Sequence, residues 1–264
     1  MSTRAMQIQY YFDKPVSSKA EDLIDELQAA MCRNCQIYSS PVTTLKHENL
    51  VVTSVYAAHE RAFEEENFSA WGKEILAKLR RLGCVLTFSL ISNLEEPEKT
   101  HNDLKYHVLF ARRYDSSLSD QHGASIALLN LPLSDQCKDQ VSAWVAKYNA
   151  CDDLWLSLNE LELSAYYQLA SVKSELSILG RTICKELEEA SNTPTYYYLF
   201  KYWGLKNLET KRLCPGCGCS WCISDNAQAD FFQFEFKCDR CRLVSSWSLD
   251  FTDKKKARIG SWQK

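Results

Sequence analysis

Two pairs of cysteines near the C-terminus have the spacing of metal ligands. Cys214 and Cys217 form one C-x2-C pair, and Cys238 and Cys241 form a second pair after an interval of 20 residues. A C-x2-C turn directs two sulfurs at one point, and Zn2+ takes four thiolates in a tetrahedron at Zn–S distances of ~2.3 Å. We therefore expect these four cysteines to bind zinc. A reduced redox dithiol is the weaker interpretation, because redox C-x-x-C motifs lie at the start of a helix.

Four thiolates leave no open position for water or substrate, so the expected zinc site is structural rather than catalytic. Pro215, Gly216 and Gly218 suit the tight turn of the first pair. Cys219 and Cys222 lie close behind it. The simplest interpretation makes both of them free thiols, because two C-x2-C pairs already complete a tetrahedron. Ligand exchange or a second ion is the alternative.

The segments around the second pair predict a β-hairpin. Residues 231–237 alternate between phenylalanine and other residues and predict a strand that runs into Cys238, and residues 243–251 predict its partner strand. Cysteine pairs joined to a hairpin in this way make a zinc ribbon. A module of about 45 residues buries too little apolar surface to be stable alone, so zinc is expected to supply much of its folding free energy.

Basic residues concentrate in the same region. Residues 211–264 carry 10 Lys and Arg against 6 Asp and Glu, whereas residues 1–210 carry 21 against 28. This asymmetry favours an RNA or DNA partner for the C-terminal end. Alternatively, the cations offset the charge of a zinc–thiolate centre, and residues 254–258 are a solvated tail. The candidate nucleic-acid contacts are Arg212, Trp221, Lys237, Arg240, Arg242 and Trp247.

The N-terminal half predicts an α+β domain. Strand patterns at residues 7–12, 36–45, 50–57 and 85–92 alternate with helical patterns at residues 19–31 and 69–82. The order strand, helix, hairpin, helix, strand predicts a ferredoxin-like (βαββαβ) domain over residues 1–132. The 85–92 segment is expected to be a buried strand. Further strands are expected at residues 106–114 and 125–131.

Helices dominate the middle of the chain. We expect them at residues 134–148, 158–179 and 181–190, with a break at Gly180. Residues 195–204 contain six aromatic side chains and are interpreted as a connector that docks the ribbon on the helices, although a stacking surface is the alternative. The predicted organisation is therefore an α/β domain at 1–132, a helical segment at 133–205, and a zinc ribbon at 206–264.

Catalytic and membrane motifs are missing from the sequence. It contains no Walker loop, nucleophile elbow, G-x-G-x-x-G or H-E-x-x-H pattern, and we expect no enzyme activity. No apolar run reaches the ~18 residues that span a bilayer. The N-terminus lacks a signal-peptide core. We therefore expect a cytoplasmic protein, in which the twelve cysteines stay reduced and form no disulfide framework.

Three stretches resemble a bacterial family of uncharacterised zinc-ribbon-containing proteins whose suspected role is nucleic-acid binding. They are Pro194–Gly204 (PTYYYLFKYWG), Cys214–Gly218 (CPGCG) followed by Trp221, and Phe234–Leu243 (FEFKCDRCRL). The resemblance implies a zinc ribbon at the four paired cysteines and a nucleic-acid role. We expect a cytoplasmic binding protein that contacts nucleic acid through the basic ribbon, with a possible protein partner on the acidic body. The alternative is a protein–protein adaptor or regulatory protein with a purely structural ribbon.

Overall fold

The computed structural model is of the α+β class and contains two sheets. It describes residues 3–91, 104–157, 161–205, 208–223 and 234–251. Contacts within the chain divide it into two compact units. Unit 1 comprises residues 1–100, 112–116 and 125–142, and unit 2 comprises residues 101–111, 117–124 and 143–264. These units follow the two sheets, so they differ from the predicted boundaries at 132 and 205.

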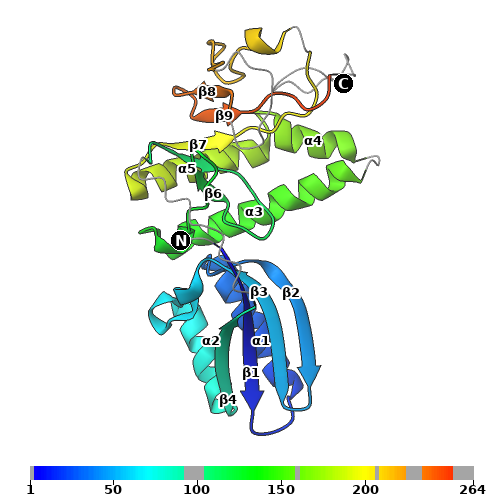
Figure 1. Cartoon of the computed structure of the whole chain (residues 1–264), viewed down its shortest axis with the longest axis vertical. Helices are drawn as coiled ribbons and strands as arrows, with labels where there is room; N and C mark the ends of the chain where they lie inside the picture. Colours follow the sequence, from blue (N-terminus) through cyan, green and yellow to red (C-terminus); the bar gives the residue numbers. More distant parts are fainter. Residues whose placement is uncertain (1–2, 92–103, 158–160, 206–207, 224–233, 252–264) are drawn as a thin grey trace. The chain divides into compact units, whose positions relative to one another are not determined.

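Unit 1 is built on a four-stranded antiparallel sheet (Figure 1). The strand order is β2-β3-β1-β4, and the element order is strand, helix, strand, strand, helix, strand, with two 3-10 turns before the second helix. This element order matches the predicted one. The elements are β1 (Arg4–Phe12), α1 (Ser18–Arg33), β2 (Ile37–His47), β3 (Leu50–Ala57), η1 (Glu60–Phe63), η2 (Glu65–Asn67), α2 (Ala70–Arg81) and β4 (Cys84–Leu90).

Local sequence accounts for these elements. Ser17 caps α1 by accepting a hydrogen bond from the Ala20 amide at 3.3 Å, and Ser69 caps α2 by accepting one from the Gly72 amide at 3.2 Å. In β1, buried and partly exposed residues alternate, so one face of the sheet points into the core. This core joins the inward side chains of the sheet to apolar residues of both helices, among them Ile8, Tyr10, Leu27, Ile75 and Leu79.

Unit 2 contains a five-stranded mixed sheet in the order β6-β5-β7-β9-β8. Its strands are β5 (His107–Leu109), β6 (Leu118–Asp120), β7 (Thr195–Tyr198), β8 (Phe236–Cys238) and β9 (Leu243–Ser245). β7 is the central strand and pairs in parallel with β5 and with β9. The predicted connector at 195–204 therefore begins as a buried strand, and the cysteine hairpin β8–β9 extends the sheet of unit 2.

The remaining helices are α3 (Asp135–Leu156), α4 (Glu162–Ala170) and α5 (Glu175–Ser191). Gly180 lies inside α5, so the predicted break there is wrong. A Cβ atom at this position would lie 2.3 Å from Tyr197 Cε2 and 2.9 Å from Trp144 Nε1. Glycine is therefore needed for close packing of α5 on β7 rather than for a bend. The predicted strand at 125–131 contains instead the 3-10 turn η3 (Leu128–Asn130).

None of the helices in the described ranges is both long enough and apolar enough to cross a membrane.

Candidate metal centre

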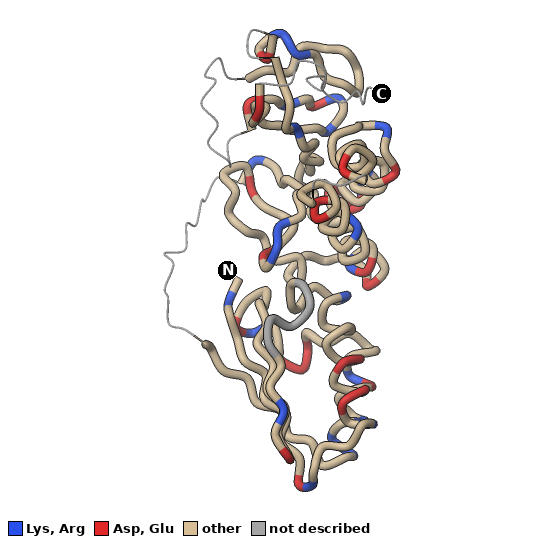
Figure 2. The backbone as a smooth tube through the Cα atoms, turned by 90° about the vertical axis from the view of Figure 1, so that its right-hand side faces the viewer, with Lys and Arg blue, Asp and Glu red and all other residues tan. Residues whose placement is uncertain are grey.

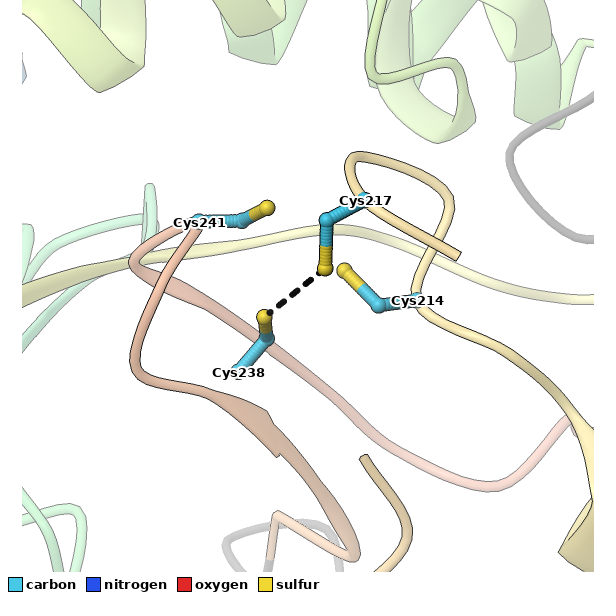
Figure 3. Close-up of side chains that lie close together, drawn as sticks. All are labelled: Cys214, Cys217, Cys238 and Cys241. Atoms are coloured by element: carbon cyan, nitrogen blue, oxygen red, sulfur yellow. Dashed lines mark hydrogen bonds between the residues drawn. The ribbon is translucent and has the colours of Figure 1, made fainter. Parts of the chain in front are cut away.

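The four paired cysteines come together in unit 2. Their Sγ atoms all lie within 4.8 Å of one another, and the side chains of Cys214, Cys217, Cys238 and Cys241 converge from two loops (Figure 3). The Sγ atoms of Cys217 and Cys238 are 3.6 Å apart. A tetrahedral ion with ligand bonds of ~2.3 Å requires sulfurs about 3.8 Å apart. The cluster could therefore hold a metal ion with little movement of the side chains.

The backbone of the first pair turns its amides toward the sulfurs. The amides of Gly216 and Cys217 donate to the Cys214 sulfur, and the amide of Cys219 donates to the Cys217 sulfur. Gly218 has a left-handed backbone, with φ at +73°, and its amide donates to the Cys214 carbonyl at 2.8 Å. These donors stabilise sulfur in its charged form, which is the form that ligates a metal.

Gly216 is required for a different reason. A Cβ atom at this position would lie 2.8 Å from the Sγ of Cys241, so only glycine lets the first cysteine loop approach the second.

The turn of the second cysteine pair resembles that of the first, but the residue with the left-handed backbone is an arginine rather than a glycine. Arg242 directly follows Cys241, as Gly218 directly follows Cys217, and Arg242 also has a left-handed backbone, with φ at +51°. A non-glycine residue in this region carries a conformational cost. Its side chain compensates by pairing with Glu188 of α5, where Arg242 Nη2 lies 2.7 Å from Glu188 Oε1. The second cysteine loop is thus tied to the helix behind the sheet.

The thiols of the cluster do not ionise alike. The hydrogen bond from the Cys219 amide lowers the pKa of Cys217 to about 6. Burial raises the pKa of Cys214 to about 11. Cys217 therefore offers a thiolate at neutral pH, and ionisation of Cys214 needs the compensating charge of a cation.

The other cysteines lie outside this cluster. Cys219 is exposed, and Cys222 lies on an isolated bridge to Phe236. Cys32 and Cys35 form a further C-x2-C pair at the end of α1, where Cys35 is buried and burial raises the pKa of its thiol to about 12. Within the described ranges, the four paired cysteines form the one group of potential metal ligands.

Three of the predicted nucleic-acid contacts are buried. Trp221 and Trp247 are 2% and 1% exposed and both pack against Phe236. Arg212 is 8% exposed, with its guanidinium 3.8 Å from the centroid of the Phe236 ring. Arg212 Nη1 lies 3.1 Å from Glu209 Oε2, and burial lowers the pKa of Arg212 to about 10. These three side chains form part of the interior of unit 2.

The other three predicted contacts lie nearer the surface. Lys237 Nζ is 2.6 Å from Asp239 Oδ1 and lies 4.9 Å from the centroid of the Tyr196 ring. Arg242 is paired with Glu188. Arg240 is exposed, and its side chain hydrogen-bonds Cys219. The predicted strand start at residues 231–233 and the basic tail at 254–258 lie outside the described residues.

Lys201 is a buried lysine that was not among the predicted site residues. Lys201 is 2% exposed, and its Nζ has no hydrogen-bond partner within the described part of the chain. Burial, together with the nearby Arg212, lowers the pKa of Lys201 to about 7, although Glu209 opposes this shift. The sequence does contain a signal for this burial. Lys201 lies within the aromatic run 195–204, and a run of this kind is mostly buried.

Comparison with known proteins places two domains of unknown function on this chain. One domain model (DUF2310) matches residues 103–200, and a second (DUF8594) matches residues 205–251. An uncharacterized protein of Haemophilus influenzae is 32% identical over 197 residues, which cover 70% of this chain and 73% of that protein. A second uncharacterized protein of the same organism is 35% identical over 154 residues, covering 55% of this chain and 73% of its own length. No solved structure matches.

Proposed function

The chain belongs to the bacterial family that includes these Haemophilus influenzae proteins, and we propose that it is a binding protein whose four-cysteine centre holds a structural zinc ion. The observation that supports the metal is the convergence of four sulfurs from two loops within 4.8 Å. Zinc is favoured among metals because it prefers four thiolates in a tetrahedral arrangement and is the usual ion of paired C-x2-C sites.

A structural role follows from the ligand count. Four thiolates fill the coordination sphere and leave no position for a substrate or an activated water. β8 and β9 have three residues each and are joined by the second cysteine loop. So short a hairpin gains little from its own hydrogen bonds, and metal binding would fix it in place.

Metal analysis of the purified protein tests this proposal. We expect one zinc per chain by inductively coupled plasma mass spectrometry, with C217S losing the metal. C219S is the matched control, because Cys219 is an exposed cysteine in the same loop that lies outside the four-sulfur cluster, and it should retain full occupancy. Equal metal content in the two variants, or a wild-type protein that binds no zinc from a buffered solution, would refute a site at these cysteines.

For the partner, we favour another protein over nucleic acid. The reason is that five of the six predicted nucleic-acid contacts are buried or paired within the chain. Arg212, Trp221 and Trp247 are buried, and Lys237 and Arg242 pair with carboxylates of the same chain. Paired or buried cations contribute little to a phosphate-binding surface, because binding would first break their internal contacts. Co-purification of one stoichiometric protein with the wild type, and its loss from C217S, would support an adaptor role.

Nucleic-acid binding is the second candidate, and exposed Arg240 supports it together with the basic sequence at 254–258. Fluorescence anisotropy with mixed-sequence RNA and DNA oligonucleotides at low salt tests it. Binding that weakens with salt and weakens further in R240A would support this candidate. K185A is the control, since it removes an exposed cation from α5. A flat titration at low salt would reject nucleic acid and leave the adaptor role.

Two further assignments belong to the same proposal. We assign unit 1 to the ferredoxin-like class, which the antiparallel order β2-β3-β1-β4 and the two helices packed into one core support. We also assign the protein to the cytoplasm, because a zinc–thiolate centre and eight further cysteines suit a reducing compartment.

A further inference from the structure

β4 is an exposed edge strand rather than the buried strand that the sequence predicted. It lies at the end of the sheet of unit 1, and in the part of the chain that the structure describes its backbone bonds only to β1. Val85 is 60% exposed and Leu90 is 39% exposed. A row of backbone N–H and C=O groups on its outer side is therefore available for pairing with another strand.

The opposite edge of this sheet is protected, whereas β4 is not. Pro41 lies within β2, where the pairing register also shifts between Tyr38 and Thr43, and Lys46 pairs with Glu21 at 2.9 Å. A proline, an irregular register and a charge are the usual means of preventing edge-to-edge pairing. The seven residues of β4, CVLTFSL, contain no proline and no charged residue. Many of the charged residues of unit 1 lie on α1, α2 and the turns (Figure 2).

We propose that β4 pairs antiparallel with β4 of a second copy of this chain and so forms a two-fold symmetric dimer with a continuous eight-stranded sheet. Full overlap of Cys84–Leu90 with itself places the two-fold axis at Thr87. Val85 then lies opposite Ser89 of the second copy, and both side chains are exposed. No like charges oppose one another in this register, because Cys84–Leu90 contains no charged residue. The net formal charge of −3 is therefore carried by other parts of the chain.

A second copy fits this edge better than a foreign strand does. The pairing is self-complementary, since the same neutral residues meet on both sides of the axis. It also closes, because each copy uses its β4 edge and retains only the protected β2 edge. Assembly therefore stops at two copies and does not continue into a filament.

Two double variants test both the dimer and its register. V85K/S89K places lysines opposite lysines across the proposed axis, and V85K/S89E places lysine opposite glutamate at the same two positions. We expect the wild-type full chain to sediment as a dimer in analytical ultracentrifugation. V85K/S89K should weaken the dimer roughly tenfold, and V85K/S89E should restore it. Melting temperatures of the variants control for folding, since these exposed positions should tolerate both changes.

Each other outcome contradicts the proposal. A wild-type monomer at every concentration would reject the dimer, even if another protein were later found on β4. A dimer that survives V85K/S89K would place the interface elsewhere. Loss of the dimer in both variants would reject the register centred on Thr87.

Discussion

The guanidinium of Arg242 donates two hydrogen bonds to the carboxylate of Glu188, from Nη2 to Oε1 at 2.7 Å and from Nε to Oε2 at 3.0 Å. This bidentate pair joins the residue that follows the last cysteine of the cluster to the last turn of α5. Arg242 also lies over the ring of Tyr196 in β7, with Cζ 5.3 Å from the ring centroid. The cysteine loop, the central strand and the helix are therefore held by one side chain, even though its backbone is left-handed.

Substitutions at Arg242 should separate the backbone cost from the side-chain benefit. R242A loses the Glu188 pair and keeps an unfavourable φ, whereas R242G loses the pair and relieves the backbone. We expect R242G to be more stable than R242A by about 1 kcal/mol in urea unfolding of the zinc-loaded protein. E188A should cost at most about 1 kcal/mol, because both partners are partly exposed and solvent screens the pair. Equal stability of R242A and R242G would contradict the role of the left-handed backbone.

Gly180 predicts a large effect from one added methyl group. G180A would place a Cβ atom 2.3 Å from Tyr197 Cε2 and 2.7 Å from Tyr197 Cδ2, and Tyr197 is fully buried. We expect it to lower the free energy of unfolding by about 2–3 kcal/mol, despite the better helix propensity of alanine. Thermal unfolding measures the change. G72A in α2 is the control and should cost much less than G180A, because its closest contact is a Phe68 ring carbon at 3.2 Å, which a shift of a few tenths of an ångström relieves.

The parts of the molecule that local patterns determine were predictable. The spacing of the cysteines fixes where two turns direct their sulfurs, and the prediction that Cys214, Cys217, Cys238 and Cys241 meet is confirmed. The α+β class is also confirmed, because periods of two and of 3.6 residues separate strands from helices in residues 4–90. Both patterns depend on neighbours along the chain.

Features that depend on distant partners were not predictable. The aromatic run Thr195–Tyr198 is predicted to begin a connector, yet it forms a central strand with parallel neighbours. Such a strand is buried on both faces and reads as a continuous apolar run without alternation. Arg212 was interpreted as a surface cation because its sequence does not reveal that Phe236 and Ser246 cover it. The exposure of β4 was not predictable for the same reason, because the composition of this strand is that of a buried one and its missing neighbour cannot be read from its own residues.

Metal removal should loosen the central strand of unit 2. The Tyr197 amide donates to the Arg242 carbonyl and the Leu199 amide donates to the Val244 carbonyl, both at 2.9 Å, so β7 relies on the strand that the cysteine loop positions. We expect a zinc chelator to increase hydrogen exchange at Tyr197 and Leu199. Amides of unit 1 such as Ile8 in β1 should be unaffected and serve as the internal control. Unchanged exchange at Tyr197 and Leu199 after the zinc has been removed would mean that the sheet holds without the metal.

Lys201 predicts a specific pH dependence of stability. Burial lowers its pKa from 10.5 to about 7 in the folded chain, so between these values the unfolded chain binds a proton that the folded chain does not. The free energy of unfolding should therefore rise with pH across this window, by at most about 1.4 kcal/mol per pH unit, and the full cost of the buried charge remains below pH 7.

Replacement of the amine tests this dependence. K201M removes the titrating group from a site that is 2% exposed, so we expect higher stability than the wild type at pH 7 and a smaller rise toward pH 9. Urea unfolding at several pH values gives both quantities. The difference between the two proteins is the informative measure, because thiol ionisation affects both alike. K185M replaces an exposed lysine of α5 and should keep the wild-type slope. An unchanged slope in K201M would show that the Lys201 amine stays charged through this range and that neighbouring groups compensate its burial.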